Sequence, residues 1–495
     1  MSLIKQLAGE TAIYGISTIL PRILHYAVFT VYLTTRVFAT EEGQYGIYAD
    51  LYAYAALLLI LFTYRLDTAY FRFGHSASDE KVVFSTGVLT LLASSFVFVL
   101  LLIFAQDQIA ALLKYPEEGQ YVVYFALIIG FDALSSLPFA RLRLTNQARK
   151  FAIIRILSVV VNLLLVFFFL EVCPRLIAAG HSFWEEVYAP DRKLDLLFAA
   201  NLIASGIVFL LLIPQLRFVQ VASFSKKILR RMLTYLLPLV VVGLGGVFNQ
   251  SFAVPLIKYL LPVGDVSVEM GIYAAAAKIA ILMNLFTVAF NYAAEPFFFK
   301  QSVTDSAKST YADVGKAFAM VASAVLLFIL LYLDVLQYLI GGNYRSGLVI
   351  VPILLVAYWF LGMYYNLSVW YKVTDKTKYG ALFSSVGVVV TLVVTMLLIQ
   401  NHGKVALAWA ALACYVAMST LAYAFGRKHY PVDYPLGRIF FYLLFALAIY
   451  FLHQNIAGDI AQIGLSLFWS SVCFVVYLGV IAWLEKKQLL AWFRT

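Results

Sequence analysis

The sequence has little of what soluble enzymes and metalloproteins depend on. Only 13% of its 495 residues are charged, and it holds six histidines and three cysteines. Cys173, Cys414 and Cys473 lie far apart with no CxxC spacing, so they predict neither a disulfide framework nor a zinc site. We therefore expect no metal site and no cofactor. The sequence also lacks a phosphate-binding P-loop, which argues against ATP as the direct energy source.

Apolar residues are abundant instead, at 63% of the chain, and the mean hydropathy is +0.89. A chain this apolar must use lipid as part of its solvent. Because a helix rises about 1.5 Å per residue, roughly 20 apolar residues cross the hydrocarbon core of a bilayer. Fourteen such runs with short connections predict an all-α polytopic membrane protein with 14 transmembrane helices. The runs are about 11–34, 45–64, 82–105, 121–140, 151–170, 194–216, 233–257, 270–292, 317–333, 348–371, 381–399, 405–425, 439–453 and 463–484.

The 36 lysines and arginines are divided unevenly between the two sets of connections. If both termini lie on one side, that side holds 25 of them, the opposite side holds 8, and the spans hold 3. The positive-inside rule then predicts cytoplasmic termini, in the inner (cytoplasmic) membrane of the cell. The basic clusters at 141–150 and 226–231 would face anionic headgroups, which favours membrane lipids over nucleic acid as partners.

A short motif, GIYA, occurs at 46–49 and again at 271–274. Each copy opens an apolar run, the second and the eighth, and the even offset of six spans means that both helices run in the same direction. This pattern predicts two parallel repeats. We expect an N-lobe of helices 1–6 over 1–216, a basic cytoplasmic connection over 217–232, and a C-lobe of helices 7–12 over 233–426. Residues 427–495 would add helices 13 and 14 and a cytoplasmic tail.

Lys278 is expected inside the membrane, because it lies within the apolar run 270–292. A lysine at mid-membrane costs about 2.5–3.5 kcal/mol on insertion scales, so it needs a counter-charge, a water-filled cavity or an anionic ligand. Glu295 and Pro296 follow this run, and we expect them to end its helix.

The first apolar run carries a polar face with Arg22 near its middle, and Pro21 allows a kink there. Arg22 would lie about 18 Å, and Lys278 about 12 Å, from the outer ends of their helices, so one anionic group could contact both. There are four second-rank candidates for substrate binding. His25 and Tyr26 lie one turn nearer the outside, and Asn249 and Gln250 on the seventh helix lie at a similar depth, although buried Asn and Gln also commonly bridge helices.

Two carboxylates within the spans are candidate ion-coupling residues. Asp50 on the second helix and Asp132 on the fourth could each be a counter-ion or a proton or sodium site. The alternative is a structural carboxylate held by neighbouring hydroxyls or by an arginine. Arg155, about one turn from the cytoplasmic end of the fifth helix, is expected to extend its charge to the interface.

The fourteen spans, the helix-1 arginine and above all the stretch YAAAAKIAILMNLFTVAFNYAAEPFFF at 273–299 resemble a known family. They are similar to the Wzx-like polysaccharide and O-antigen flippases of the multidrug/oligosaccharidyl-lipid/polysaccharide exporter (MOP) superfamily. This resemblance implies a MATE-like fold of two six-helix lobes, and alternating access that carries an isoprenoid-diphosphate-linked oligosaccharide to the outer leaflet. It also implies cavity cations that hold the diphosphate, at positions such as Arg22 and Lys278. The related lipid II flippases carry more cavity arginines, which argues against lipid II itself as the cargo.

The function expected from these features is transport for cell-surface polysaccharide biosynthesis, and not catalysis. Partners would be the lipid-linked oligosaccharide, membrane lipids, H+ or Na+, and possible polysaccharide polymerases and glycosyltransferases. One alternative is a cation-coupled multidrug exporter of the MATE type, whose cavity should favour carboxylates and aromatics. The other is a membrane oligosaccharide ligase, which would be expected to have a large outer loop with catalytic side chains.

Overall fold

The computed structural model describes residues 28–74, 77–181, 183–188, 192–261, 264–301, 307–374, 376–457 and 463–486. Across these residues the chain is almost entirely helical and has no strand. Thirteen helices in this part of the chain are long and apolar enough to cross a membrane, which makes the protein a multi-pass membrane protein. They confirm the thirteen predicted spans from position 45 onward. The first predicted span, 11–34, lies mostly outside the described residues.

Contacts divide the chain into two compact units. The first unit contains Tyr48–Phe252, together with residues up to Phe29. Its helices are α3 (Glu42–Thr63, from Tyr48 onward), α4 (Leu66–Phe73), α5 (Ala77–Phe104), α6 (Gln106–Leu112), α7 (Gly119–Leu144), α8 (Ala148–Phe167), α9 (Cys173–Ala178), α10 (Phe183–Val187), α11 (Lys193–Leu216) and α12 (Lys226–Ser251).

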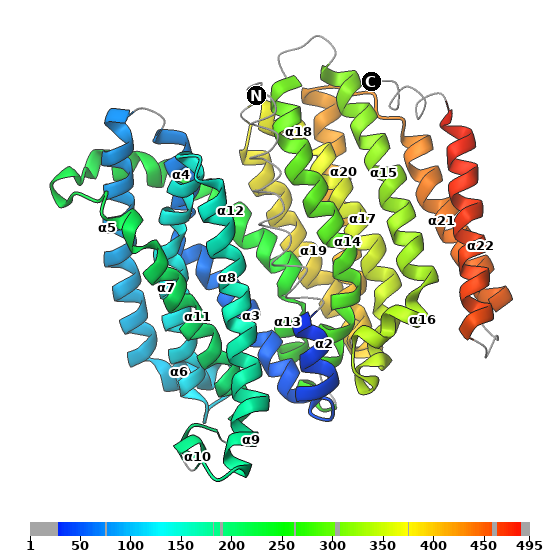
Figure 1. Cartoon of the computed structure of the whole chain (residues 1–495). Coiled ribbons are helices and arrows are strands. Elements are labelled where there is room, and N and C mark those ends of the chain that lie inside the picture. Colours follow the sequence, from blue (N-terminus) through cyan, green and yellow to red (C-terminus); the bar gives the residue numbers. More distant parts are fainter. Residues whose placement is uncertain are drawn as a thin grey trace. The chain divides into compact units, whose positions relative to one another are not determined.

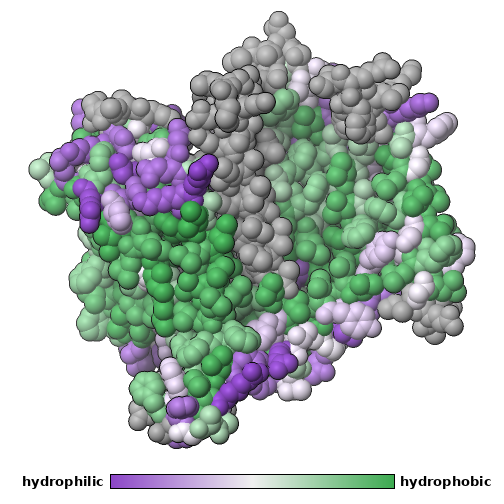
Figure 2. All heavy atoms as spheres, in the orientation of Figure 1, coloured by the Kyte–Doolittle hydropathy of each residue, from purple (hydrophilic) through white to green (hydrophobic). Residues whose placement is uncertain are grey.

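The central helix of the first unit is α7, which packs against α4, α5, α6, α8 and α11 (Figure 1). At one end of the unit a core of fully buried side chains, including Tyr70, Phe84 and Leu137, joins α4, α5 and α7 to α12. Helices α5 and α8 expose large apolar side chains such as Phe104 and Leu164. Figure 2 shows these apolar residues as a band along the unit, with polar residues gathered at its ends. This banding is expected of helices whose outer faces contact lipid.

The second unit contains Thr30–Ile47 and Ala253–Thr495. Its short N-terminal segment comprises α2 (Thr30–Tyr32), a π-helical turn (Leu33–Val37) and the first turns of α3. The helices of the rest of the unit are α13 (Ala253–Leu260), α14 (Val266–Gln301), α15 (Ala307–Leu331), α16 (Leu333–Leu336), α17 (Val351–Leu367), α18 (Val369–Val373), α19 (Lys378–His402), α20 (Val405–His429), α21 (Leu436–Ala457) and α22 (Ile463–Leu484), with a 3-10 segment at Gly342–Ile350.

Within the second unit, α17 packs against α14, α15 and α20, whereas α21 and α22 pack against α15 (Figure 1). Glu485, just after α22, links α22 to α15 and α21. Its carboxylate contacts Lys316 Nζ at 2.9 Å and Arg438 Nη1 at 3.1 Å, and it accepts a hydrogen bond from the Tyr442 hydroxyl at 2.7 Å. The side chains of Glu485 and Lys316 are only 4% and 10% exposed, whereas Arg438 is 62% exposed, so a buried ion pair with a third charge at the surface links helices α15, α21 and α22.

The boundary between the units does not follow helix ends alone. It passes through α3 between Ile47 and Tyr48, and between α12 and α13 after Phe252. This division follows packing and not the repeat order, so the lobes at 1–216 and 233–426 and the segments at 217–232 and 427–495 stay predictions.

Helix α14 is 36 residues long and continues through Pro296 to Gln301. The expectation that Glu295 and Pro296 end this helix is therefore wrong. A proline removes one backbone hydrogen bond, and membrane helices tolerate this loss where neighbouring groups satisfy the freed carbonyl.

The glycines that open the two GIYA motifs, Gly46 and Gly271, meet within the second unit. A Cβ added to Gly271 of α14 would overlap the carbonyl oxygen of Glu42, and one added to Gly46 of α3 would overlap that of Ser267 and lie 2.8 Å from the Gly271 nitrogen. Backbone approaches this close leave no room for a side chain, which is why glycine stands at both positions. The repeated glycines therefore form the crossing of α3 and α14.

Candidate functional site

Lys278 lies at the middle of its span. The membrane-crossing part of α14 is Val266–Asn291, and Lys278 is twelve residues, about 18 Å, from its start. Its side chain is half-buried and lies on the face of α14 shared with Ile281. The opposite face, with Ala276 and Ala280, is buried, and Ala276 lies against Gly347 of the 3-10 segment Gly342–Ile350. The span begins four residues before the predicted run, so Lys278 lies about 6 Å farther from its start than the 12 Å that the sequence predicted.

The other members of the predicted substrate site either belong to the first unit or lie outside the described residues. Arg22, His25 and Tyr26 lie outside the described residues, so their pairing with Lys278 stays a prediction. Asn249 and Gln250 form the last turn of α12 in the first unit, where Asn249 is buried and Gln250 is exposed. Neighbouring residues on a helix point about 100° apart, so the pair does not act as one polar surface.

Asp50 is completely buried on the first-unit part of α3. The hydroxyl of Tyr115, in the turn between α6 and α7, donates a hydrogen bond to Asp50 Oδ2 at 2.8 Å. The bond joins residues 65 positions apart and holds α3 against this turn. The sequence contained no signal for this partner, because the contact is created only by the packing of the helices.

Asp132 belongs to a polar cluster inside the first unit, formed by Tyr52 of α3, Asp132 of α7, and Asn201 and Ser205 of α11. The Ser205 hydroxyl hydrogen-bonds the Asp132 carboxylate. Nearby, Asn201 Nδ2 donates to the Tyr52 hydroxyl at 2.8 Å, and the charge of Asp132 also acts on Tyr52. We call these four residues the α7 polar cluster. Its amide, hydroxyl and carboxylate oxygens suit a small hard cation or a proton.

The positive charge of Arg155, on α8, also acts on the Asp132 carboxylate. Its guanidinium also lies over the Phe139 ring, with 4.0 Å from Cζ to the ring centroid. Sequence reasoning missed Tyr52, Asn201 and Ser205. The available signal was the i, i+4 spacing of Asn201 and Ser205 on an otherwise apolar helix.

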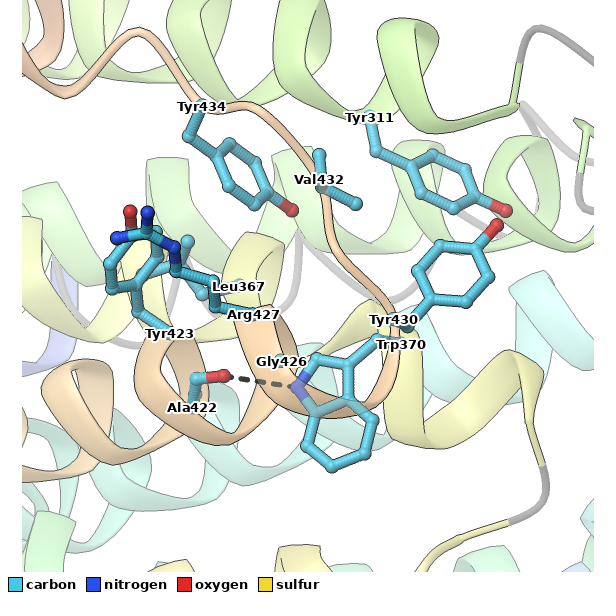
Figure 3. A pocket seen from close by; sticks show the side chains of 10 residues that line it. All are labelled: Tyr311, Leu367, Trp370, Ala422, Tyr423, Gly426, Arg427, Tyr430, Val432 and Tyr434. Carbon is cyan, nitrogen blue, oxygen red and sulfur yellow. Dashed lines mark hydrogen bonds between the residues drawn. The ribbon is translucent and has the colours of Figure 1, made fainter.

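A small aromatic pocket in the second unit is not a substrate site. Tyr311, Trp370, Tyr430 and Tyr434 surround it, and Trp370 Nε1 donates to the Ala422 carbonyl at 3.0 Å (Figure 3). Its volume is about 10 Å³, which is room for at most one water. The pocket is therefore part of the packing of α15, α18 and α20. Across the described residues, no group of three or more His, Cys, Asp or Glu side chains is arranged to hold a metal ion.

No family model matches the chain, and no curated protein matches its sequence. Its fold nevertheless matches solved structures over most of its length. A lipid II flippase, MurJ, in an inward closed conformation superposes with a TM-score of 0.70 at 14% identity, covering 95% of this chain and 99% of that one. An inward-facing multidrug resistance MATE family transporter of the MOP superfamily gives 0.60 at 14% identity, with 84% and 94% covered. An outward-facing MATE structure gives 0.60 at 13%, with 86% and 95% covered.

These similarities establish the fold. The chain has the helical membrane fold that MurJ shares with MATE transporters, as the predicted fold class stated.

Proposed function

We propose that the protein is a flippase that moves an isoprenoid-diphosphate-linked oligosaccharide from the cytoplasmic to the outer leaflet by alternating access. It would belong to the Wzx-like polysaccharide branch and serve cell-surface polysaccharide biosynthesis. The observation that carries the proposal is Lys278, a cation at the middle of a membrane span in a chain with the fold of a lipid II flippase.

The chemistry of the substrate matches such a cation. A diphosphate cannot enter hydrocarbon unaided, whereas a fixed lysine offers it a charge-assisted contact while the isoprenoid tail remains in lipid. We propose that Arg22 acts together with Lys278, because a guanidinium can bind two phosphate oxygens at once. His25, Tyr26, Asn249 and Gln250 would contact the sugar or the diphosphate.

Coupling to H+ or Na+ is assigned to Asp132 and, second, to Asp50. The Asp132 carboxylate has three oxygen- or nitrogen-bearing neighbours in the α7 polar cluster, which supports an ion site. The Tyr115 bond gives Asp50 a structural role as well. The termini would be cytoplasmic and the protein would reside in the inner membrane, where polymerases and glycosyltransferases are possible partners.

A cation-coupled multidrug exporter is the second candidate, because MATE structures share the fold at a TM-score of 0.60. Cationic cargo is disfavoured by a lysine at mid-span, since like charges repel in a low-dielectric site. An oligosaccharide ligase stays an alternative from the sequence alone, because no feature of the described residues adds support for catalysis.

The test is binding and translocation of a lipid-linked oligosaccharide in reconstituted vesicles by an Arg22→Ala/Lys278→Ala variant. Each cation removed should cost about 10- to 100-fold in affinity, the value of a charge-assisted contact of roughly 1.5–3 kcal/mol. Arg175→Ala is the matched control, because Arg175 is a 74% exposed cation on α9. If the double variant binds and moves the lipid at the parental level, the diphosphate site lies elsewhere. If it instead exports cationic drugs, the MATE reading is favoured.

A further inference from the structure

A basic groove lies at one end of the first unit, and none of the residues that line it belongs to the α7 polar cluster. Its volume is about 860 Å³, and it is formed by the last turn of α4 and the first turns of α12. Figure 2 shows polar residues gathered at the end of the unit that carries α4 in Figure 1. The groove has five cations in its wall: Arg72, Lys226, Lys227, Arg230 and Arg231. We call it the α4–α12 groove.

The cations of this groove differ from their neighbours in having no acidic partner among the described residues. Among the described residues, Arg141 contacts Glu80 at 3.4 Å and Arg143 contacts Asp67 at 3.9 Å at the same end of the unit. No described carboxylate lies within 4.0 Å of any of the five groove cations. All five side chains are exposed. Five positive charges around one concave surface, none of them paired with a carboxylate of the described residues, attract an anion strongly.

Aromatic rings hold two of the guanidinium groups in place. Arg72 Cζ lies 4.3 Å from the centroid of the Tyr235 ring, and Arg231 Cζ lies 5.1 Å from that of Phe73. A guanidinium stacked on a ring keeps its N–H edge available for phosphate oxygens and loses less entropy on binding. The N-terminus of α12, capped by Ser225, adds the positive end of a 26-residue helix dipole to the same place.

An apolar stripe leads from the groove along α12. Leu233, Leu237 and Val241, at i, i+4 and i+8, have 38%, 69% and 42% of their side-chain surface exposed. The stripe begins one turn after Arg230, so cationic and apolar surfaces are continuous on one helix. A soluble phosphate would use only the first surface, whereas a lipid with a phosphate headgroup and acyl chains would use both.

We propose that the α4–α12 groove binds an anionic phospholipid that carries two phosphodiester groups, with acyl chains along the α12 stripe. Two phosphates match five cations and a cavity of this volume better than one does. The lipid bound here is not the transported substrate but a membrane component that holds the start of α12 against α4. This binding site is independent of the proposed flippase activity.

The experiment uses the purified full-length protein in neutral detergent. Binding of diphosphatidylglycerol is measured by native mass spectrometry and by the shift in thermal unfolding, in parallel with phosphatidylcholine, inorganic pyrophosphate and an isoprenyl diphosphate. The parent should bind diphosphatidylglycerol and be stabilised by it. Arg230→Gln/Arg231→Gln should weaken binding about 10- to 100-fold. The matched control, Arg149→Gln/Lys150→Gln, removes the same charge from the other predicted basic cluster and should change binding less than about twofold.

Two conservative variants separate binding from folding. Arg72→Lys keeps the charge but loses the planar stack on Tyr235. It should weaken lipid binding several-fold without lowering the unfolding temperature of the lipid-free protein. Leu237→Ser should weaken lipid binding while leaving any pyrophosphate binding unchanged. The proposal would be overturned if the control variant lost as much lipid binding, or if pyrophosphate stabilised the protein as much as the lipid does. Preference for the isoprenyl diphosphate would also overturn it, because the groove would then be a substrate-loading site.

Discussion

Replacing Gly271 by alanine is expected to destabilise the crossing of α3 and α14. The added Cβ would overlap the carbonyl oxygen of Glu42 and lie 3.2 Å from the Gly46 nitrogen. Both of these atoms belong to the backbone of a helix, so neither can rotate away as a flexible side chain would. Overpacking of this kind costs about 1–3 kcal/mol, whereas alanine for glycine in an open helix position stabilises by up to about 1 kcal/mol.

The matched control is Gly479→Ala in α22, where an added Cβ meets nothing within 4 Å in the same unit. The two variants make the same chemical change and are expected to act in opposite directions. Thermal and denaturant unfolding of the purified protein should therefore show Gly271→Ala below the parent and Gly479→Ala at or above it. Gly46→Ala should resemble Gly271→Ala, and the double variant should cost less than the sum, because one displacement of α3 relieves both overlaps.

A Gly271→Ala protein as stable as the parent, with the control behaving as expected, would refute the close crossing. Unchanged transport by a destabilised variant would show in turn that the crossing supports the fold only. Measuring stability and translocation on the same preparation distinguishes these outcomes.

The remaining predictions concern the charged residues. Glu485→Gln should lower stability by about 3–5 kcal/mol in unfolding assays, because it leaves Lys316 buried without its carboxylate. Burial alone would raise the pKa of Glu485, but Tyr442, Lys316 and Arg438 outweigh it and leave that pKa below its usual value. This contribution should therefore be complete above the ordinary carboxylate pKa and disappear as the pH falls through the lowered one, a loss that the Gln variant should not show. Asp132→Asn should change the dependence of transport on pH or sodium; if both it and Asp50→Asn leave that dependence unaltered, neither carboxylate couples an ion. A cysteine at Lys226 should react with a membrane-impermeant reagent only after the cytoplasmic side is opened, and labelling of intact cells would reverse the predicted orientation.

The sequence predicted the spans well because crossing a bilayer depends on the length and hydropathy of a single segment. Lys278 could be assigned to a span for the same reason, but its predicted distance from the start of that span was about 6 Å too short, because the span begins four residues earlier than the predicted run. Contacts between helices could not be read in this way. The bond from Tyr115 to Asp50 and the neighbours of Asp132 depend on how α3, α7 and α11 are rotated about their axes, which hydropathy does not determine.

The GIYA repeat shows both the value and the limit of such reasoning. Its recurrence indicated a duplication, but the motif gave no reason to expect its two glycines to contact each other. The failure at Pro296 had a different cause: a local rule for helix ends was applied in a membrane helix, where the alternatives to a hydrogen-bonded helix are costlier than in water.

The path of α3 has a mechanical consequence. Its first turns belong to one unit and its remainder to the other, yet the helix is unbroken from Glu42 to Thr63. By contrast, the chain leaves α12 through a break at Phe252 before α13 begins. A continuous helix acts as a stiff rod, whereas a break acts as a joint. A rotation of α3 about its own axis would therefore turn Gly46 of the crossing and Tyr52 of the cluster that contains Asp132 together, because the two residues lie six positions, about 9 Å, apart on one unbroken helix.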